Sequence, residues 1–208
     1  MQETNLILFL TASLALIVAP GPDNILVLTR GIAQGRGAAL VSAAGASAGL
    51  VVHSTFAAVG LSALLQQSAV AFSVVKYAGA AYLIYLGIKT LLDRESFAVT
   101  GETAPARLRS VFFQVVASNV LNPKVALFFL AFLPQFANPA AGGAAPQLLA
   151  LGLTFALLTW VIFSVLGYFS GSLGNWLVSR PDLANGLRWL TGGVLIGLGL
   201  RLALPDRR

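Results

Sequence analysis

Long apolar segments fill almost the whole chain of 208 residues, and they restrict it to a membrane fold. Hydrophobic residues make up 57% of the sequence and charged residues only 10%, which is typical of integral membrane proteins. A helix needs about 20 apolar residues to cross a bilayer. Segments of about this length occur at residues 6–28, 38–64, 70–91, 111–132, 148–173 and 187–204. We therefore predict an all-α integral membrane protein with about six transmembrane helices.

Two prolines interrupt these apolar segments, and a charged residue directly follows each of them. Pro22 precedes Asp23, and Pro123 precedes Lys124. A proline inside a helix removes a backbone donor and crowds the carbonyl four residues earlier, so the helix breaks there. In a membrane, such breaks and charges are tolerated where they are packed in protein or line a solute cavity. Secondary transporters build midplane binding sites in this way, so the sequence predicts a small transporter.

The two breaks occupy corresponding places in the two halves of the chain. A polar stretch at 93–109 separates three apolar segments from three more, and the first segment of each half contains a break. An odd number of spans inverts the second half relative to the first, which predicts a 3+3 inverted-topology repeat. We expect one transmembrane domain made of a three-helix repeat at 1–92, a cytoplasmic linker at 93–109 and a second repeat at 110–208.

The positions of the basic residues predict the orientation of the chain in the membrane. The second and fourth connections hold no Lys or Arg, whereas the first, third and fifth hold Arg30, Arg36, Lys89, Arg94, Arg107, Arg109, Arg180 and Arg188. By the positive-inside bias, those three connections are cytoplasmic and both termini are external. The opposite orientation is favoured by three basic residues near the C-terminus, Arg201, Arg207 and Arg208. The net charge of +6 is scattered between spans, so the predicted partner is the lipid bilayer and not nucleic acid.

The residue inventory excludes several kinds of site. The chain has no cysteine, which removes disulfides and thiolate metal sites. Its single histidine, His53, and one carboxylate within a span make a poor metal site. We find no Walker loop and no metalloprotease helix motif. The sequence therefore predicts no metal, no cofactor and no enzyme activity.

The first break is predicted to bind a cation. Pro22 suits the first position of a helix, and Asp23 in the first turn is favoured by the helix dipole. The carbonyls at about 16–19 lose their usual donors. Together with the Asp23 carboxylate, they would hold an ammonium group or a coupling proton, and Gly21 and Asn24 belong to the same motif.

The second break is predicted to bind an anion. Asn122 is a good N-cap and Pro123 a good first helical residue, so the backbone donors of 125–126 would face the anion. Lys124 lies at the positive end of this helix, where a cation is unfavourable, which implies an anionic partner such as a carboxylate. Asn119 lies one turn earlier and would bond the freed backbone or the substrate.

A free amino acid carries both of the groups for which the two breaks are suited, so together they predict a zwitterion site. The alternative is that Asp23 and Lys124 neutralise each other as a buried ion pair. Both interpretations would hold if Asp23 and Lys124 pair with each other in the empty protein and a zwitterionic substrate separates them when it binds.

Two further polar residues within spans are candidates. His53 lies at four-residue spacing from Gly45 and Gly49, so it faces a neighbouring helix. It would either assist a proton-coupled step or simply hydrogen-bond between packed helices. Lys76 would either contribute to the site or extend to the outer surface.

Small residues recur at helical spacing in three spans, which indicates close helix packing. The pairs are Gly45 and Gly49, Gly167 and Gly171, and Gly193 and Gly197. Such faces serve either contacts within one chain or a homodimer, which is a possible partner arrangement here.

These motifs resemble those of the LysE/RhtB family of bacterial amino-acid exporters. The similar features are Pro20-Gly21-Pro22-Asp23, the glycine-rich second span with His53, residues 76–83 of the third span, and Asn119 with Asn122-Pro123-Lys124. The resemblance covers essentially the whole chain. It implies a protein of the bacterial cytoplasmic membrane that exports amino acids such as homoserine, threonine, leucine or lysine, driven by the proton-motive force.

The function we predict is efflux of a small neutral amino acid or derivative in exchange for protons, by alternating access around the breaks. Lys124 would hold the carboxylate, Asp23 the ammonium group or the proton, and His53 would assist coupling. One alternative is a permease for cations or other small ions on the same scaffold. Another is an intramembrane enzyme that uses Asp23 and His53 as acid and base.

Overall fold

The computed structural model describes residues 3–19, 21–62, 69–92, 106–137, 143–171 and 181–204. Almost all of them are helical, and none of them forms a strand. The elements are α1 (Glu3–Val18), α2 (Pro22–Gln34), α3 (Arg36–Phe56), η1 (Ala57–Leu61), α5 (Ala69–Leu92), α6 (Leu108–Val120), α7 (Pro123–Ala131), η2 (Leu133–Phe136), α8 (Ala144–Tyr168) and α10 (Pro181–Ala203). The prediction of an all-α protein is confirmed.

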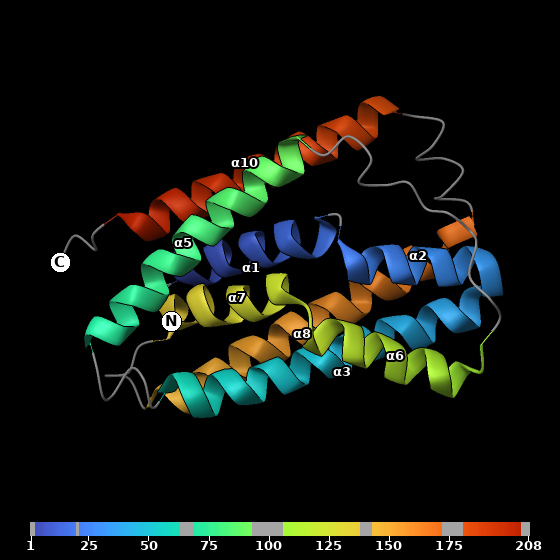
Figure 1. The fold of residues 1–208 in the computed structure, drawn as a ribbon, viewed down its shortest axis with the longest axis horizontal. Coiled ribbons are helices and arrows are strands. Elements are labelled where there is room, and N and C mark those ends of the chain that lie inside the picture. The colour runs from blue at the N-terminus through green and yellow to red at the C-terminus, as the bar shows by residue number, and fades with distance from the viewer. Residues whose placement is uncertain are drawn as a thin grey trace.

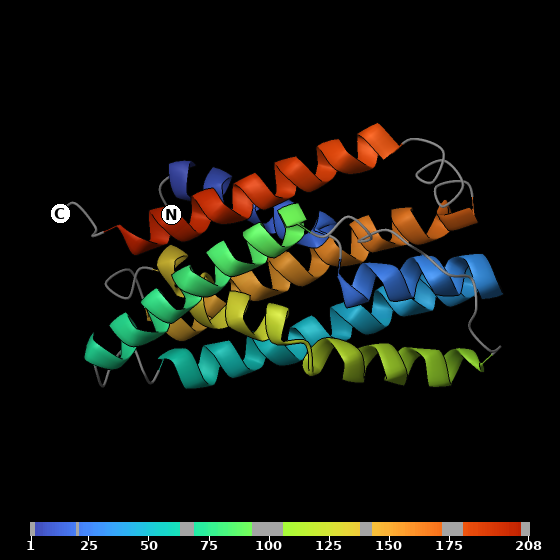
Figure 2. The ribbon, with the colours of Figure 1, turned by 45° about the horizontal axis from the view of Figure 1, so that its top comes forward.

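The helices lie side by side along one long axis (Figures 1 and 2). Arg36–Gly60 and Ala144–Tyr168 are each long and apolar enough to cross a membrane, and the pairs α1 with α2 and α6 with α7 meet the same test when each pair is taken as one span. The predicted third and sixth spans correspond to α5 and α10, which lie along each other in both views. The start of α1 and the end of α10 lie at the same end of the bundle (Figure 1).

Both predicted helix breaks are present. The axis bends by 53° between α1 and α2 and by 52° between α6 and α7. The second helix of each pair begins with its proline, Pro22 or Pro123, in the first turn, where the missing N–H costs nothing. The similar bends support the inverted repeat, which stays a prediction together with its boundaries. Pro20 and residues 93–105 of the expected linker lie outside the described residues.

Glycines allow α5 and α10 to approach closely. A Cβ on Gly87 would lie 2.7 Å from the carbonyl oxygen of Gly192, and a Cβ on Gly199 would lie 2.8 Å from that of Ala80. A real side chain at either position would force the two backbones apart. Helix α5, which flanks the breaks, is therefore held in place by backbone contact with α10.

The small-residue faces found in the sequence differ in their surroundings. A Cβ on Gly45 would lie 2.8 Å from the carbonyl oxygen of Phe112, and a Cβ on Gly167 would lie 2.8 Å from the Cβ of Ala39, so both serve packing within the chain. Gly193 and Gly197 have nothing within 4 Å among the described residues. Homodimerisation stays a prediction, and the pair on α10 is free to take part in it.

We expect Gly87→Leu to lower the melting temperature of the protein in detergent by roughly 5 °C or more, because overpacking costs about 1–3 kcal/mol and each kcal/mol shifts a protein of this size by about 2–4 °C. Gly186→Leu is the matched control, because its side chain enters open space on α10 and Gly186 is not part of the paired glycine face. Its melting temperature should stay within about 2 °C of the parent. Equal losses in both variants would contradict the α5–α10 contact.

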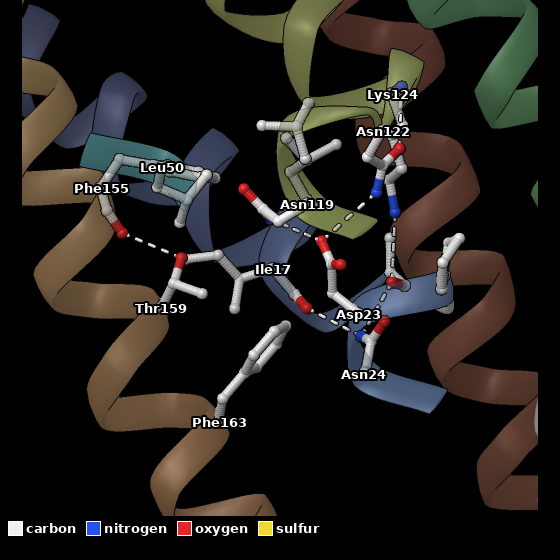
Figure 3. A pocket seen from close by; sticks show the side chains of 15 residues that line it. Ile17, Asp23, Asn24, Leu50, Asn119, Asn122, Lys124, Phe155, Thr159 and Phe163 are labelled. Carbon is white, nitrogen blue, oxygen red and sulfur yellow. Dashed lines mark hydrogen bonds between the residues drawn. The ribbon is translucent and has the colours of Figure 1, made fainter. Parts of the chain in front are cut away.

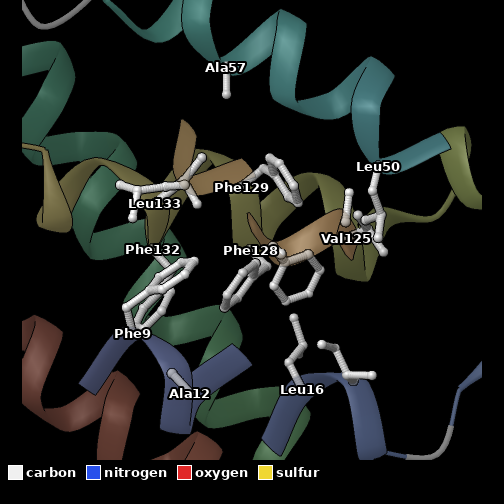
Figure 4. Packing of buried hydrophobic residues seen from close by; sticks show 14 of the residues in the cluster. Phe9, Ala12, Leu16, Leu50, Ala57, Val125, Phe128, Phe129, Phe132 and Leu133 are labelled. Carbon is white, nitrogen blue, oxygen red and sulfur yellow. The ribbon is translucent and has the colours of Figure 1, made fainter. Parts of the chain in front are cut away.

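A cluster of aromatic side chains fills the bundle between the breaks and the end where α1 begins (Figure 4). Phe128 of α7 lies between Phe132 and Phe155, with ring centroids 4.8 and 5.0 Å away. Phe9 of α1 meets Phe136 at 5.4 Å. All five rings are buried. On this side of the breaks, these rings fill the space between α1, α7 and α8, while a separate cavity of about 350 Å³ lies between α3 and α7.

Candidate functional site

The two helix breaks meet in the middle of the bundle, and each contributes to one polar cluster (Figure 3). Asp23 of α2 is 7% exposed. Its Oδ2 accepts hydrogen bonds from Asn119 Nδ2 at 2.7 Å and from Asn122 Nδ2 at 3.3 Å. Its Oδ1 is buried and accepts no hydrogen bond from the described residues. The protein thus positions one carboxylate oxygen and leaves the other to face the cluster.

The carbonyls at the end of α1 are bonded by side chains from both breaks. Asn24 Nδ2 donates to the carbonyl oxygens of Ile17 at 2.9 Å and Ala19 at 3.0 Å. Lys124 Nζ donates to the carbonyl oxygen of Ala19 at 3.2 Å. The expectation that these carbonyls need donors in a membrane is confirmed. In this conformation, the carbonyl of Ala19 binds a cation of the protein itself, Lys124.

Asp23 and Lys124 lie in the same cluster without a direct bond. Within the described residues no ion pair joins them, because amides hold the carboxylate while the carbonyl of Ala19 holds the ammonium group. This arrangement differs from the buried ion pair that the sequence left open. Gly21 leaves room for the lysine, since a Cβ there would lie 3.2 Å from Lys124 Nζ. Each charge is therefore held by neutral groups that a ligand can replace.

The start of α7 is capped as expected. The side chain of Asn122 accepts a hydrogen bond from the backbone N–H of Lys124 at 3.0 Å, and Pro123 occupies the first turn. The prediction of a free backbone donor at Ala126 is wrong, because this N–H donates to the carbonyl oxygen of Asn122 at 3.1 Å. Among the described residues, the groups that this break still offers to an anion are the charge of Lys124 and the backbone N–H of Val125.

His53 reaches the cluster through Asn119. Its Nε2 lies 3.1 Å from the backbone oxygen of Asn119, whose side chain bonds Asp23. A Cβ on Gly49 would lie 2.5 Å from Asn119 Oδ1, so the glycine allows α3 to approach α6 here. His53 is therefore linked to Asp23 through one residue, whereas Lys76 lines none of the cavities found at the cluster among the described residues.

The cluster surrounds a cavity of about 30 Å³, which has room for only one or two water molecules. Seven of the eight predicted substrate-binding residues line it, namely Gly21, Pro22, Asp23, Asn24, Asn119, Asn122 and Lys124. Pro123 lines a larger cavity that adjoins it. A free amino acid does not fit into the smaller cavity, so binding there requires the helices to separate. The structure brings the predicted residues together, and their role stays a prediction.

The apolar wall of this cavity was missed from the sequence. Phe155, Thr159 and Phe163 of α8 line it, together with Leu50 of α3 (Figure 3). The three α8 residues follow one another at four-residue spacing on one helix face. Thr159 is a buried polar residue in a strongly apolar span, which was the signal available. Its hydroxyl donates to the carbonyl of Phe155 at 2.9 Å, so its donor is already used.

Comparisons with known proteins found similar sequences over nearly the whole chain. Residues 14–205 match the family described as LysE type translocator. A homoserine/homoserine lactone efflux protein of Salmonella typhimurium is 32% identical, with 94% of each chain aligned. A leucine efflux protein of Enterobacter sp. is 29% identical over 94% of this chain and 93% of its own. An uncharacterized membrane protein of Vibrio cholerae is 30% identical over 94% of each chain. No solved structure matches.

Proposed function

Because the chain belongs to the family of LysE type translocators, we propose that it exports small neutral amino acids or their derivatives from the cytoplasm. Membership of this family makes the chain a multi-pass membrane transporter and not an enzyme, which removes the intramembrane-enzyme alternative. Two relatives named for the efflux of leucine and of homoserine support an amino-acid substrate. The observation that carries the proposal is the placement of Asp23 and Lys124 in one buried cluster without a direct bond.

In the proposed complex, the substrate replaces contacts that the protein makes with itself. Its ammonium group binds Oδ1 of Asp23 and takes over the bond from Lys124 to the carbonyl of Ala19. Lys124 then turns to the substrate carboxylate, because Arg and Lys form their stronger hydrogen bonds with ionised partners. Asn119 and Asn122 continue to hold the other oxygen of Asp23.

The apolar wall favours a substrate with a short or aliphatic side chain. Leu50, Phe155 and Phe163 present hydrocarbon to the cavity. A second positive charge on the substrate would be buried there without a partner, at a large cost. We therefore propose leucine-like and homoserine-like substrates in preference to lysine.

Exchange for protons follows from competition for Asp23. A carboxylate that binds either a proton or an ammonium group cannot bind both, so each passage of the substrate would be linked to the return of a proton. His53, whose Nε2 contacts the backbone oxygen of Asn119 beside Asp23, would assist this coupling. In the proposed orientation, the end of the bundle near Arg36, Arg107 and Arg188 is cytoplasmic.

The cation-permease alternative is disfavoured by the position of Lys124. Its ammonium group bonds the same carbonyl that a metal or other small cation would use, and it lies in the same cluster as Asp23. A cation that replaced it would share the one carboxylate of the described cluster, Asp23, with the displaced ammonium group, so one of the two positive charges would lack a counter-ion.

The experiment is efflux from proteoliposomes loaded with labelled leucine, homoserine, lysine or isoamylamine, which is leucine without its carboxylate. Leucine and homoserine should leave faster when the opposite side is made acidic, and this acceleration should disappear when a protonophore removes the gradient. Lysine and isoamylamine should leave only at the rate measured with liposomes that contain no protein. Flux of metal or alkali ions without flux of any amino acid would contradict the proposal.

A further inference from the structure

A second cavity adjoins the cluster on the side of α5 and is far larger than the first. Its volume is about 350 Å³, within the range of small-molecule binding sites. Gly21, Pro22, Asn122 and Lys124 line both cavities, so the two are direct neighbours. A ligand in the larger cavity would lie directly against Lys124.

This larger cavity carries positive charge only. Its charged lining residues are Lys89 of α5 and Lys124 of α7, and the part of the chain that the structure describes contributes no carboxylate to it. The hydroxyl of Thr90 donates to the carbonyl oxygen of Leu86 at 2.8 Å, so it adds no free donor. Cavities lined by one sign of charge concentrate ligands of the opposite sign.

The cavity reaches the cytoplasmic end of α5 in the proposed orientation. Lys89 is exposed and lies in the last turn of α5, which ends at Leu92 where the third connection begins. The prolines of both breaks, Pro22 and Pro123, are exposed and line the same cavity. Toward the opposite end, the aromatic cluster around Phe128 fills the space between α1, α7 and α8, and the cavity between α3 and α7 shares no lining residue with the cavity at the breaks. In this conformation, the breaks are therefore approached from the side of α5.

We propose that this cavity is the cytoplasmic entrance to the substrate site and that Lys89 is an outer anion subsite, which binds the substrate carboxylate before Lys124 does. The identity of the ligand rests on the proposed export function, whereas the charge of the cavity does not. The two lysines would admit zwitterions and exclude amines before either reaches Asp23.

Cysteine labelling tests the cavity without any transport measurement, because the native chain has no cysteine. Leu86→Cys places a thiol in the cavity, and Ile88→Cys places one on the same helix at an exposed apolar position that does not line it. The anionic sulfonatoethyl and the cationic trimethylammonioethyl methanethiosulfonates are applied from either side of the membrane. Leu86→Cys should react from the cytoplasmic side, and faster with the anionic reagent, whereas Ile88→Cys should react slowly with both.

Addition of Lys89→Gln to Leu86→Cys should reduce the ratio of anionic to cationic labelling rates roughly fivefold, because one unit charge at close range is removed. Lys89→Arg should preserve the ratio, and high salt should reduce it in the parent. If Leu86→Cys folds poorly, Thr90→Cys on the same lining serves instead. The proposal would be overturned if neither reagent labelled the cavity cysteine, or if the ratio of anionic to cationic labelling rates were the same with and without Lys89→Gln.

Transport measurements then distinguish the proposal of an entrance cavity from the proposed export of amino acids. Lys89→Gln should raise the KM for leucine efflux roughly fivefold at low salt, with kcat unchanged and the KM difference lost in high salt. Leucine should also slow the labelling of Leu86→Cys. Charge-selective labelling without protection by any amino acid would retain the anion cavity and reject the amino acid as its ligand. Normal amino-acid transport with no charge selectivity would reject the entrance alone.

Discussion

Asp23→Asn should reduce amino-acid efflux by up to about 100-fold while the protein stays folded. The loss of a charge-assisted hydrogen bond of up to about 3 kcal/mol corresponds to roughly this factor. Folding should survive because a carboxamide oxygen can accept the same two bonds from Asn119 and Asn122 that Oδ2 accepts now. The variant also removes a buried charge, which is costly to desolvate. Efflux from proteoliposomes and the melting temperature measure the two effects.

Asn119→Ala provides a graded comparison for this variant. It removes the shorter of the two bonds to Asp23 but keeps the charge and the bond from Asn122, so we expect a loss of about tenfold. The acceleration of efflux by an acidic opposite side should persist in Asn119→Ala and disappear in Asp23→Asn. Proton-driven efflux at the parental rate in a folded Asp23→Asn protein would remove Asp23 from the mechanism.

The helix breaks and their caps could be predicted from sequence because their causes are local. A proline removes a backbone donor and crowds the carbonyl four residues earlier wherever it stands in a helix, so Pro22 and Pro123 predict helix breaks without knowledge of the fold. The cap at Asn122 follows from the same reasoning. The free donor predicted at Ala126 failed because the carbonyl of Asn122 also belongs to the first turn and accepts its N–H.

The contacts between the breaks could not be predicted, because they depend on how distant helices pack. The sequence assigns Asp23 to a cation and Lys124 to an anion. It does not show that the side chains of Asn24 and Lys124 would donate hydrogen bonds to the carbonyls at the end of α1. The sequence also names Lys76 as the candidate of the third span and places Lys89 in the third connection, whereas the structure has both lysines on α5. Lys76 and Lys89 lie on opposite parts of the helix surface, roughly 140° apart at 3.6 residues per turn, and only the packing of α5 shows that Lys89 lines a cavity at the breaks.

Lys124→Gln should weaken leucine binding about 30-fold, the equivalent of about 2 kcal/mol for a lysine bonded to a carboxylate. Its binding of isoamylamine should change little, because this amine has no carboxylate to lose. The carbonyl of Ala19, which Lys124 bonds in the parent, also becomes available to the amine, so isoamylamine should bind at least as well as it does to the parent. Binding is measured by the ligand-dependent rise in melting temperature, which reports mass action on the folded state.

Lys76→Gln is the matched control for Lys124→Gln, because it removes the same charge from a residue that does not line the described cavities at the breaks. It should bind leucine as the parent does. Lys124→Arg keeps the charge on a longer side chain, and it should retain most of the preference for leucine over isoamylamine. If Lys124→Gln weakened both ligands equally, the lysine would only stabilise the end of α1. If Lys76→Gln lost leucine while Lys124→Gln kept it, the carboxylate site would lie elsewhere.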